Sequence, residues 1–268
     1  MAGGLAVAVA VAATVQAGVL TPRRLRVPDV PLSPPGWPAE LDGLRVAVVG
    51  DLHAGAPWVD LARVRGVVRA VVAASPDLVL LLGDQLADVA LGRQVSLADL
   101  AEALTGLRAA GPVVGVLGNH DWYAGGHRVR AALEDAGLPV LEESAVAVLG
   151  GRLWVAGVGD LWERSPDVGA ALSGVPEGLP VVLLTHNPDV VSDVPAQVQL
   201  VLAGHTHGGQ LAVRGRPIHT ISERTGNRWS RGWYPDVRMF VTSGVGSSTL
   251  PVRNVVPEVP VLVLSTGC

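Results

Sequence analysis

The sequence predicts an α/β fold whose first half is βαβα and whose second half is mainly β. Short apolar runs alternate with segments of helical periodicity up to about residue 136, and the later apolar runs have few helices between them. Hydrophobic residues make up 49% of the 268 residues and charged residues 16%, so the chain can bury a large core. This length suits one large α/β domain or two small ones.

The first element is an uncharged segment over residues 2–20, and three of the six residues that follow are arginine. We predict a membrane anchor over residues 1–21, because a membrane span needs roughly 17–25 residues. The arginines would leave the main domain in the cytoplasm. One alternative is a signal segment that is cleaved at Val15-Gln16-Ala17, with export of the protein; the other is a buried helix.

Residues 22–42 are predicted to be a proline-rich linker. Five prolines lie between residues 28 and 38, and this density excludes a helix. The main domain is therefore predicted to cover residues 43–268.

Three strands and three helices are predicted in the first half of this domain. Each strand is an apolar run, and each helix has apolar residues at helical spacing. Ser96 is expected to cap the second helix, and Gly137 to end the third. In chain order the elements are strand 44–49, helix 59–74, strand 77–82, helix 96–110, strand 113–117 and helix 128–136.

The second half contains further strands. Residues 145–149 and 153–158 flank Gly150-Gly151 and are predicted to pair as a hairpin. The other predicted strands cover residues 180–184, 198–203, 238–243 and 259–264.

Polar side chains follow the ends of five of these strands. Any one of them could be a helix cap or a turn residue, but five at one sheet edge would be left without partners unless a metal bound them. Carboxylate, imidazole and amide ligands suit Mn, Fe, Zn or similar ions rather than a soft metal. The segments are Gly50-Asp51-Leu52-His53, Gly83-Asp84, Gly118-Asn119-His120-Asp121, Thr185-His186-Asn187 and Gly204-His205-Thr206-His207.

The pair His205 and His207 carries the most information among these residues. In a continued strand both side chains would point to the same face, because side chains alternate with period two. Two imidazoles aimed in one direction suit a metal ion, although two loop histidines beside glycines are an alternative when the pair is taken alone.

Together the five motifs resemble the calcineurin-like metallophosphoesterase family, in the family's order and over residues 44 to 264. The resemblance implies a four-layer α/β/β/α sandwich, the metallo-dependent phosphatase fold, with a dimetal site at the strand ends. Residues 208–210, 242–246 and 250–253 are similar to a branch that has an N-terminal membrane segment. That branch includes proteins related to UDP-diacylglucosamine hydrolases.

The resemblance also implies a role for each motif residue. Two divalent or transition metal ions, with Mn, Fe or Zn favoured, would be bridged by Asp84. Two such ions can clamp both oxygens of an in-line displacement and generate hydroxide, which attacks phosphorus. One site would be completed by Asp51, His53 and His207, and the other by Asn119, His186 and His205.

His120 would be the active-site acid, with Asp121 as the carboxylate that orients it. An imidazole at this place could stabilise the transition state or protonate the leaving oxygen. Carboxylates commonly fix the tautomer of such histidines.

Five tryptophans lie on or near the motif loops or the late loops. We expect Trp58 and Trp122 to form an apolar wall over the metals, for a lipid tail, a base or a sugar. Packing inside the loops is the alternative, and it is favoured for the other three, Trp162, Trp229 and Trp233.

Residues 214–238 are locally basic, with six arginines against two acidic residues in a chain of net charge −4. Arg224 and Arg228 are expected to recruit an anionic substrate, because Arg binds phosphate in bidentate geometry. Contact with anionic lipid and a solvated, salt-bridged loop are the alternatives.

The predicted function is hydrolysis of a phosphoester, with a phosphodiester or a pyrophosphate favoured. The branch resemblance adds a lipid-linked or nucleotide-sugar substrate. The alternatives are a phosphomonoesterase, a nuclease, and a membrane-anchored scaffold that holds metal without catalysis. The net charge gives no argument for a nucleic-acid partner, and the single Cys268 excludes an internal disulfide and argues against a thiolate metal site.

Overall fold

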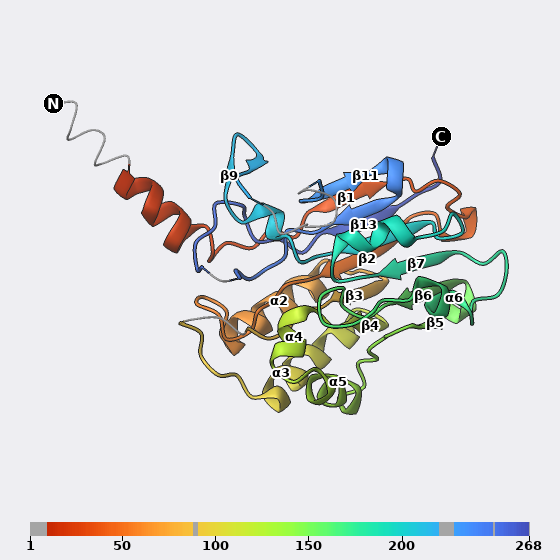
Figure 1. Ribbon diagram of the computed structural model, residues 1–268, viewed down its shortest axis with the longest axis horizontal. Coiled ribbons are helices and arrows are strands. Elements are labelled where there is room, and N and C mark those ends of the chain that lie inside the picture. The colour runs from red at the N-terminus through yellow and green to blue at the C-terminus, as the bar shows by residue number, and fades with distance from the viewer. Residues whose placement is uncertain (1–9, 88–90, 220–227, 249, 268) are drawn as a thin grey trace.

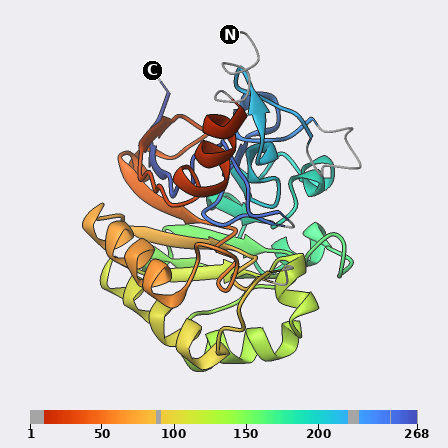
Figure 2. The same ribbon diagram turned by 90° about the vertical axis from the view of Figure 1, so that its left-hand side faces the viewer.

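Two β-sheets packed face to face, with helices outside them, form the four-layer α/β/β/α sandwich that was predicted (Figure 1). The structure is a computed structural model and describes residues 10–87, 91–219, 228–248 and 250–267. In Figures 1 and 2 the helices α2 (Leu61–Ala73), α3 (Leu97–Thr105) and α5 (Gly126–Asp135) lie together on one outer side of the sandwich.

The first sheet has five strands in the order β1-β13-β2-β3-β4. Strands β2, β3 and β4 run parallel, whereas β13 is antiparallel to β2 and parallel to β1. Strands β2, β3 and β4 are continuous apolar runs, which is typical of parallel strands that are covered on both faces of a sheet. The strands are β1 (Asp29–Leu32), β2 (Leu44–Val49), β3 (Leu78–Leu82), β4 (Val113–Val116) and β13 (Val261–Leu264).

The second sheet has six strands in the order β11-β12-β8-β7-β6-β5. Its four inner strands are parallel, and the edge strands β11 and β5 are antiparallel to their neighbours. The predicted hairpin is therefore present, as β5 and β6. The strands are β5 (Ser144–Val148), β6 (Leu153–Gly157), β7 (Val181–Leu184), β8 (Leu200–Ala203), β11 (Gly232–Tyr234) and β12 (Met239–Val241).

The helices begin where the sequence offers a cap. Asp60 accepts a hydrogen bond from the Arg63 amide at 2.8 Å, and Ser96 accepts one from the Asp99 amide at 3.4 Å, as predicted for Ser96. The α-helices are α2 (Leu61–Ala73), α3 (Leu97–Thr105), α4 (Asn119–Tyr123), α5 (Gly126–Asp135) and α6 (Val168–Leu172). Shorter elements are η1 (Gln16–Leu20), η2 (Ala39–Leu41), η3 (Gly106–Ala109), η4 (Leu149–Gly151), η5 (Pro188–Asp193), η6 (His207–Gly209), η7 (Pro235–Val237) and the hairpin β9 (Ala212–Val213) and β10 (Arg216–Pro217).

Three apolar clusters separate the four layers. Alternation along β2 shows the arrangement, since Val46 and Val48 pack between the sheets, whereas Ala47 and Val49 pack against the helices. A third cluster joins the outer face of the second sheet to α6 and η5. The central strands are thus buried on both faces, which holds the loops at their carboxyl ends in fixed places.

The predicted linker differs from the structure. Residues 29–32 are extended, but they pair with β13 as an edge strand, and Trp37 and Leu41 are buried. Proline is tolerated at such an edge, because an edge strand leaves one set of amides unpaired. The folded part of the chain therefore begins before residue 43.

The predicted membrane anchor is wrong. Residues 1–9 lie outside the described part of the chain, and in the part that is described no helix is long and apolar enough to cross a membrane. The described end of this segment instead contacts the domain, since the Gly18 carbonyl accepts from Trp58 Nε1 at 3.1 Å and the Ala17 carbonyl accepts from the Arg253 amide at 2.9 Å. The predicted membrane-anchored localisation is overturned with it.

Candidate metal centre

All seven predicted metal ligands lie within one buried cluster. They come from both sheets: three strands of the first sheet and two of the second direct their carboxyl ends to the same place, as open α/β sheets commonly do at ligand sites. Each of the seven residues is at most 2% exposed. They are Asp51 and His53 after β2, Asp84 after β3, Asn119 after β4, His186 after β7, and His205 and His207 after β8.

The first predicted site joins Asp51, His53 and His207. The Nε2 atoms of the two histidines are 3.1 Å apart, and His207 Nε2 is 3.6 Å from Asp51 Oδ1. One ligand atom from each of the three residues can be chosen so that all lie within 4.8 Å of one another. That spacing suits one small cation.

The second predicted site joins Asn119, His186 and His205. His205 Nδ1 lies 3.1 Å from Asn119 Oδ1 and 3.1 Å from His186 Nε2. Asp84 Oδ2 lies 3.2 Å from His186 Nε2 and 3.4 Å from His53 Nε2. The same carboxylate oxygen therefore faces both groups, which is the geometry that a bridging ligand requires.

The hydrogen bonds of the histidines show that this cluster fits cations. His186 Nδ1 donates to the Leu82 carbonyl at 2.7 Å, and His207 Nδ1 donates to the Gly246 carbonyl at 3.2 Å. Each Nε2 is then left with a lone pair that points into the cluster, and Asp51 Oδ2 is buried without a hydrogen-bond partner among the described residues. Lone pairs and carboxylates that face one another need a positive charge between them.

The pKa values of three of the four histidine ligands favour the neutral imidazole that binds a metal, whereas the Asp84 carboxylate outweighs burial and raises the pKa of His186. Burial lowers the pKa of His53 to about 3 and lowers the pKa values of His205 and His207 well below the usual range. Burial alone would raise the pKa of Asp84, but the His186 imidazole beside it holds that pKa below its usual range. These three imidazoles are therefore neutral and Asp84 is ionised, as metal ligands must be.

Five of the ligands have a left-handed backbone, which side chains other than glycine rarely adopt. The chain turns sharply at each strand end, so that the side chains point to one centre instead of alternating. His205 and His207 therefore reach the same centre through a turn. The sequence had suggested a continued strand at this place. Such strain costs about 1–3 kcal/mol per residue and is concentrated at functional sites. The residues and φ angles are Asp51 (50°), His53 (48°), Asp84 (53°), His205 (70°) and His207 (51°).

Gly204 directly precedes His205 and lies against the predicted ligand Asp51. A Cβ at Gly204 would lie 2.6 Å from Asp51 Oδ2. We therefore expect Gly204→Ala to displace the carboxylate and to weaken metal affinity about 10–100-fold, the usual effect of disturbing a group that supports a ligand. Isothermal titration of the metal-free protein with Mn²⁺ measures this.

The matched control is Gly174→Ala, because a Cβ there would have nothing within 4 Å. Equal Mn²⁺ affinity of the two variants would contradict the expectation.

His120 occupies the opening of the centre. It is half-buried, its ring lies 4.7 Å from that of His53, and its amide donates to Asp84 Oδ1 at 2.9 Å. His53, Asp84 and His120 also offer atoms within 4.8 Å of one another, so His120 is close enough to act either on substrate or as a further ligand.

The predicted contact between Asp121 and His120 is absent from the described hydrogen bonds. Asp121 Oδ1 accepts from the amides of Gln85 and Leu86 at 2.9 and 3.1 Å, and Oδ2 accepts from the Gly118 amide at 3.0 Å. Among the residues that the structure describes, none forms a hydrogen bond with the buried Nδ1 atom of His120. Asp121 therefore holds the loop that carries Asp84, and it does not orient His120.

Arg253 is a fully buried cation that lies next to the metal centre and donates hydrogen bonds to backbone carbonyls there. It donates to the carbonyls of Val255 at 2.8 Å, Ser243 at 2.9 Å and Gly246. The Gly246 carbonyl is also the acceptor of His207 Nδ1. Burial lowers the pKa of Arg253 to about 10, so the guanidinium stays charged at neutral pH.

We expect Arg253→Met to lower the free energy of unfolding by about 3 kcal/mol, because it leaves buried carbonyls without donors. For a chain of this size that is a drop of roughly 6–12 °C in Tm, which calorimetry of the metal-free protein measures. Arg69→Met, at an exposed position on α2, should leave Tm nearly unchanged. A drop of equal size in both variants would contradict the supporting role of Arg253.

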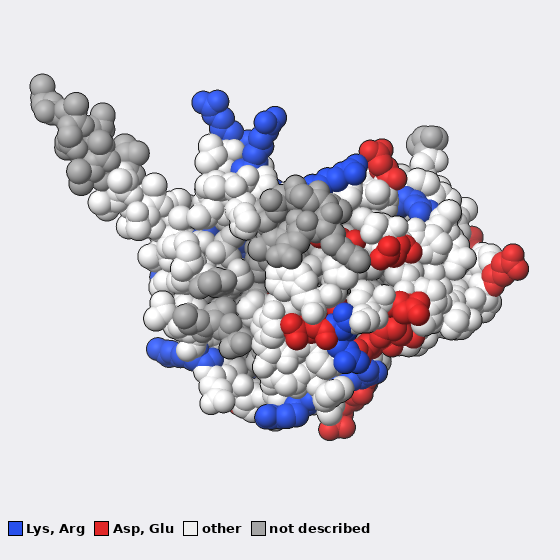
Figure 3. Space-filling view, viewed as in Figure 1, with Lys and Arg blue, Asp and Glu red and all other residues white. Residues whose placement is uncertain are grey.

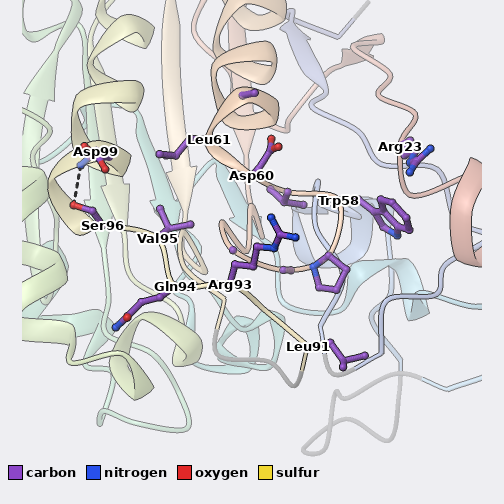
Figure 4. Close-up of a pocket in the computed structure, with 15 residues that line it drawn as sticks. Arg23, Trp58, Asp60, Leu61, Leu91, Arg93, Gln94, Val95, Ser96 and Asp99 are labelled. Atoms are coloured by element: carbon purple, nitrogen blue, oxygen red, sulfur yellow. Dashed lines mark hydrogen bonds between the residues drawn. The ribbon is translucent and has the colours of Figure 1, made fainter.

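The predicted tryptophan wall is wrong at both positions. Trp58 stacks under the Arg23 guanidinium at 4.0 Å and lines a cavity of about 830 Å³ with Leu61, Leu91 and Arg93 (Figure 4). Of the metal-centre residues, none lines this cavity among the residues described.

Trp122 also points away from the metal centre. Its ring contacts the guanidinium of Arg164 at 4.6 Å and the ring of His127 at 5.2 Å. The side chain therefore packs between α4, α5 and the loop after β6.

Residues 220–227 of the basic loop lie outside the described part of the chain. Arg224 lies outside the described residues, and Arg228 is exposed with its guanidinium 4.5 Å from the Trp229 ring. Recruitment of an anionic substrate by these arginines stays a prediction.

Three residues that were not predicted at the centre do lie beside it. The Trp162 ring is 4.4 Å from that of His205, and the Tyr123 ring is 5.5 Å from that of His120. Asp160 is buried next to Trp162, and burial raises its pKa. The signal for Asp160 is present in the sequence, since Gly159-Asp160 follows the strand at 153–158 as Gly83-Asp84 follows β3.

Comparison with known proteins agrees with this arrangement. A family model described as calcineurin-like phosphoesterase matches residues 44–209. The phosphodiesterase YaeI of Escherichia coli is 30% identical over 235 residues, which cover 82% of each chain. An uncharacterized metallophosphoesterase of Aquifex aeolicus is 31% identical over 230 residues, or 84% of this chain and 85% of that one. A zebrafish (Danio rerio) protein named transmembrane protein with metallophosphoesterase domain is 31% identical over 247 residues, but only 54% of its length is covered.

Proposed function

The chain belongs to the calcineurin-like phosphoesterase family, and we propose on this premise that it is a dimetal-dependent hydrolase of phosphodiesters. The observation that carries the proposal is the position of Asp84 Oδ2, within 3.4 Å of a histidine of each predicted site. The relative named a phosphodiesterase supports a diester over a monoester. The narrower resemblance to UDP-diacylglucosamine hydrolases stays a prediction.

Two bound divalent ions would polarise the phosphoryl oxygens and lower the pKa of a water molecule. The chain's own residues would supply the rest. The Leu82 and Gly246 carbonyls fix the tautomers of His186 and His207. His120, at the opening, would donate a proton to the leaving oxygen or stabilise charge on the phosphoryl group.

The test uses the 268-residue chain, stripped with chelator and given back Mn, Fe, Zn or Mg one at a time. We expect metal-dependent hydrolysis of bis(para-nitrophenyl) phosphate that exceeds hydrolysis of para-nitrophenyl phosphate. Faster cleavage of the monoester would favour a phosphomonoesterase. Two bound ions without hydrolysis of either ester would favour the scaffold alternative.

A further inference from the structure

Among the residues predicted at the metal centre, His120 is the most accessible to solvent. The seven predicted ligands are at most 2% exposed, whereas His120 is only half-buried. A substrate must therefore approach the metals past His120 and the side chains that surround it.

Two exposed aromatic rings border this approach. Tyr123 is 47% exposed and lies on the same face of α4 as His120, since residues three apart on a helix are neighbours. Trp162 is 38% exposed and contacts His205 in a perpendicular arrangement, with an interplanar angle of 86°. Exposed rings at the mouth of a buried polar site are available to bind one arm of a substrate.

Two carboxylates belong to the loop that carries Trp162. Asp160 Oδ1 accepts from the amides of Trp162 and Glu163 at 2.9 and 3.0 Å, whereas Asp160 Oδ2 is buried with no hydrogen-bond partner among the described residues. Glu163 is exposed, and no ion pair joins it to any residue in the described ranges.

The nearby cation is already neutralised. Arg164 forms an ion pair with Glu142 at 2.5 Å, and Glu142 is also paired with Arg130. A cavity of about 480 Å³ beside Trp162 is lined by Glu142, Glu143, Glu163 and Arg164. Figure 3 shows acidic side chains, with arginines among them, on the right-hand half of this face, where β5, β6 and β7 lie in Figure 1. An anionic substrate arm would be repelled here, and a cationic one attracted.

We propose that Tyr123, Trp162 and Glu163 form a subsite for a positively charged arm of the phosphodiester, of the quaternary ammonium class, with the buried carboxylate of Asp160 next to Trp162. Aromatic faces attract such cations through the ring quadrupole, and the two carboxylates add the opposite charge. The subsite rests on the proposed function, because it binds one of the two ester arms while the metals hold the phosphoryl group.

The test compares para-nitrophenyl esters that differ only in the second arm. The arms are choline, its uncharged isostere 3,3-dimethylbutyl, and phenyl. In each case water adds to phosphorus, the bond to para-nitrophenolate breaks, and the phosphate ester of the second arm is the other product. Each kcat/KM is divided by the uncatalysed rate, which removes differences in intrinsic reactivity.

We expect the choline ester to be preferred to its neutral isostere by about tenfold, the size of a cation–π contact reinforced by nearby charge. Trp162→Ala and Glu163→Gln should each lower this ratio, and Trp162→Phe, which keeps an aromatic ring, should largely retain it. Glu177→Gln, at an exposed position after α6, should leave the ratio unchanged. A ratio of one or less, or a preference for the phenyl arm, would overturn the proposal.

A binding experiment separates the subsite from the chemistry. Tetramethylammonium chloride is added to the protein, and saturation transfer from protein to the methyl groups is measured by NMR. Transfer in the natural protein that is lost in Trp162→Ala supports the subsite even if no ester is cleaved, in which case the proposed function alone has failed. No transfer in the natural protein would overturn the subsite, whatever the hydrolysis assays show.

Discussion

Asp84→Ala should remove both metals at once. Its Oδ2 atom lies 3.2 and 3.4 Å from histidines of the two predicted sites, and both contacts disappear with the carboxylate. Metal stabilisation of a phosphoryl transition state is worth several kcal/mol, so turnover should fall by at least about a thousandfold. Metal content by mass spectrometry, after dialysis against trace Mn²⁺, should fall from two ions per chain to less than one.

Asp77→Ala is the control for this variant, because Asp77 precedes the other end of the same strand, β3, and is exposed. It should retain two ions and full turnover. Retention of two ions by Asp84→Ala, in protein whose circular dichroism is unchanged, would refute the bridge.

His120→Asn should lower kcat by about 10²–10⁴-fold, the usual contribution of general acid catalysis. Two metals should remain bound, because each predicted site is complete without His120. The measurement pairs kcat for bis(para-nitrophenyl) phosphate with metal content. It therefore separates the two roles that the geometry allows, since loss of a metal would assign His120 as a ligand.

The histidine control is His127→Asn, on α5, where the exposed side chain contacts Trp122 and none of the predicted ligands among its described contacts. It should leave kcat within a factor of about two, as surface substitutions usually do. Unchanged kcat in His120→Asn would show that the proposed acid role is wrong.

The sequence predicts the framework of this protein well, because the signals are local. The apolar run at 44–49 is β2 without a shift, and five strand ends bring their polar residues to one centre. β1 was missed because its partner is β13, a contact between the two ends of the chain that composition cannot reveal.

The direction of side chains was the second feature that could not be predicted from the sequence. Asp121 follows His120 directly in the sequence, but α4 begins at Asn119, so successive side chains on it point about 100° apart. The same rotation sends Trp122 toward Arg164 and returns Tyr123 to the face of His120. Adjacency in the sequence alone does not show which of these side chains lies beside His120. The residue at which this short helix begins decides it.

The place of β13 in the first sheet has a consequence for how the protein folds. β13 lies between β1 and β2, and Val46 pairs with Leu262, roughly 200 residues later in the chain; such distant contacts slow folding. The loop with Asp51 and His53 leaves β2 directly, so its position depends on a strand that joins from the far end of the sequence. Ordered assembly of the metal-binding loops must therefore wait for this long-range pairing, and the metal centre is expected to be among the last parts of the molecule to form.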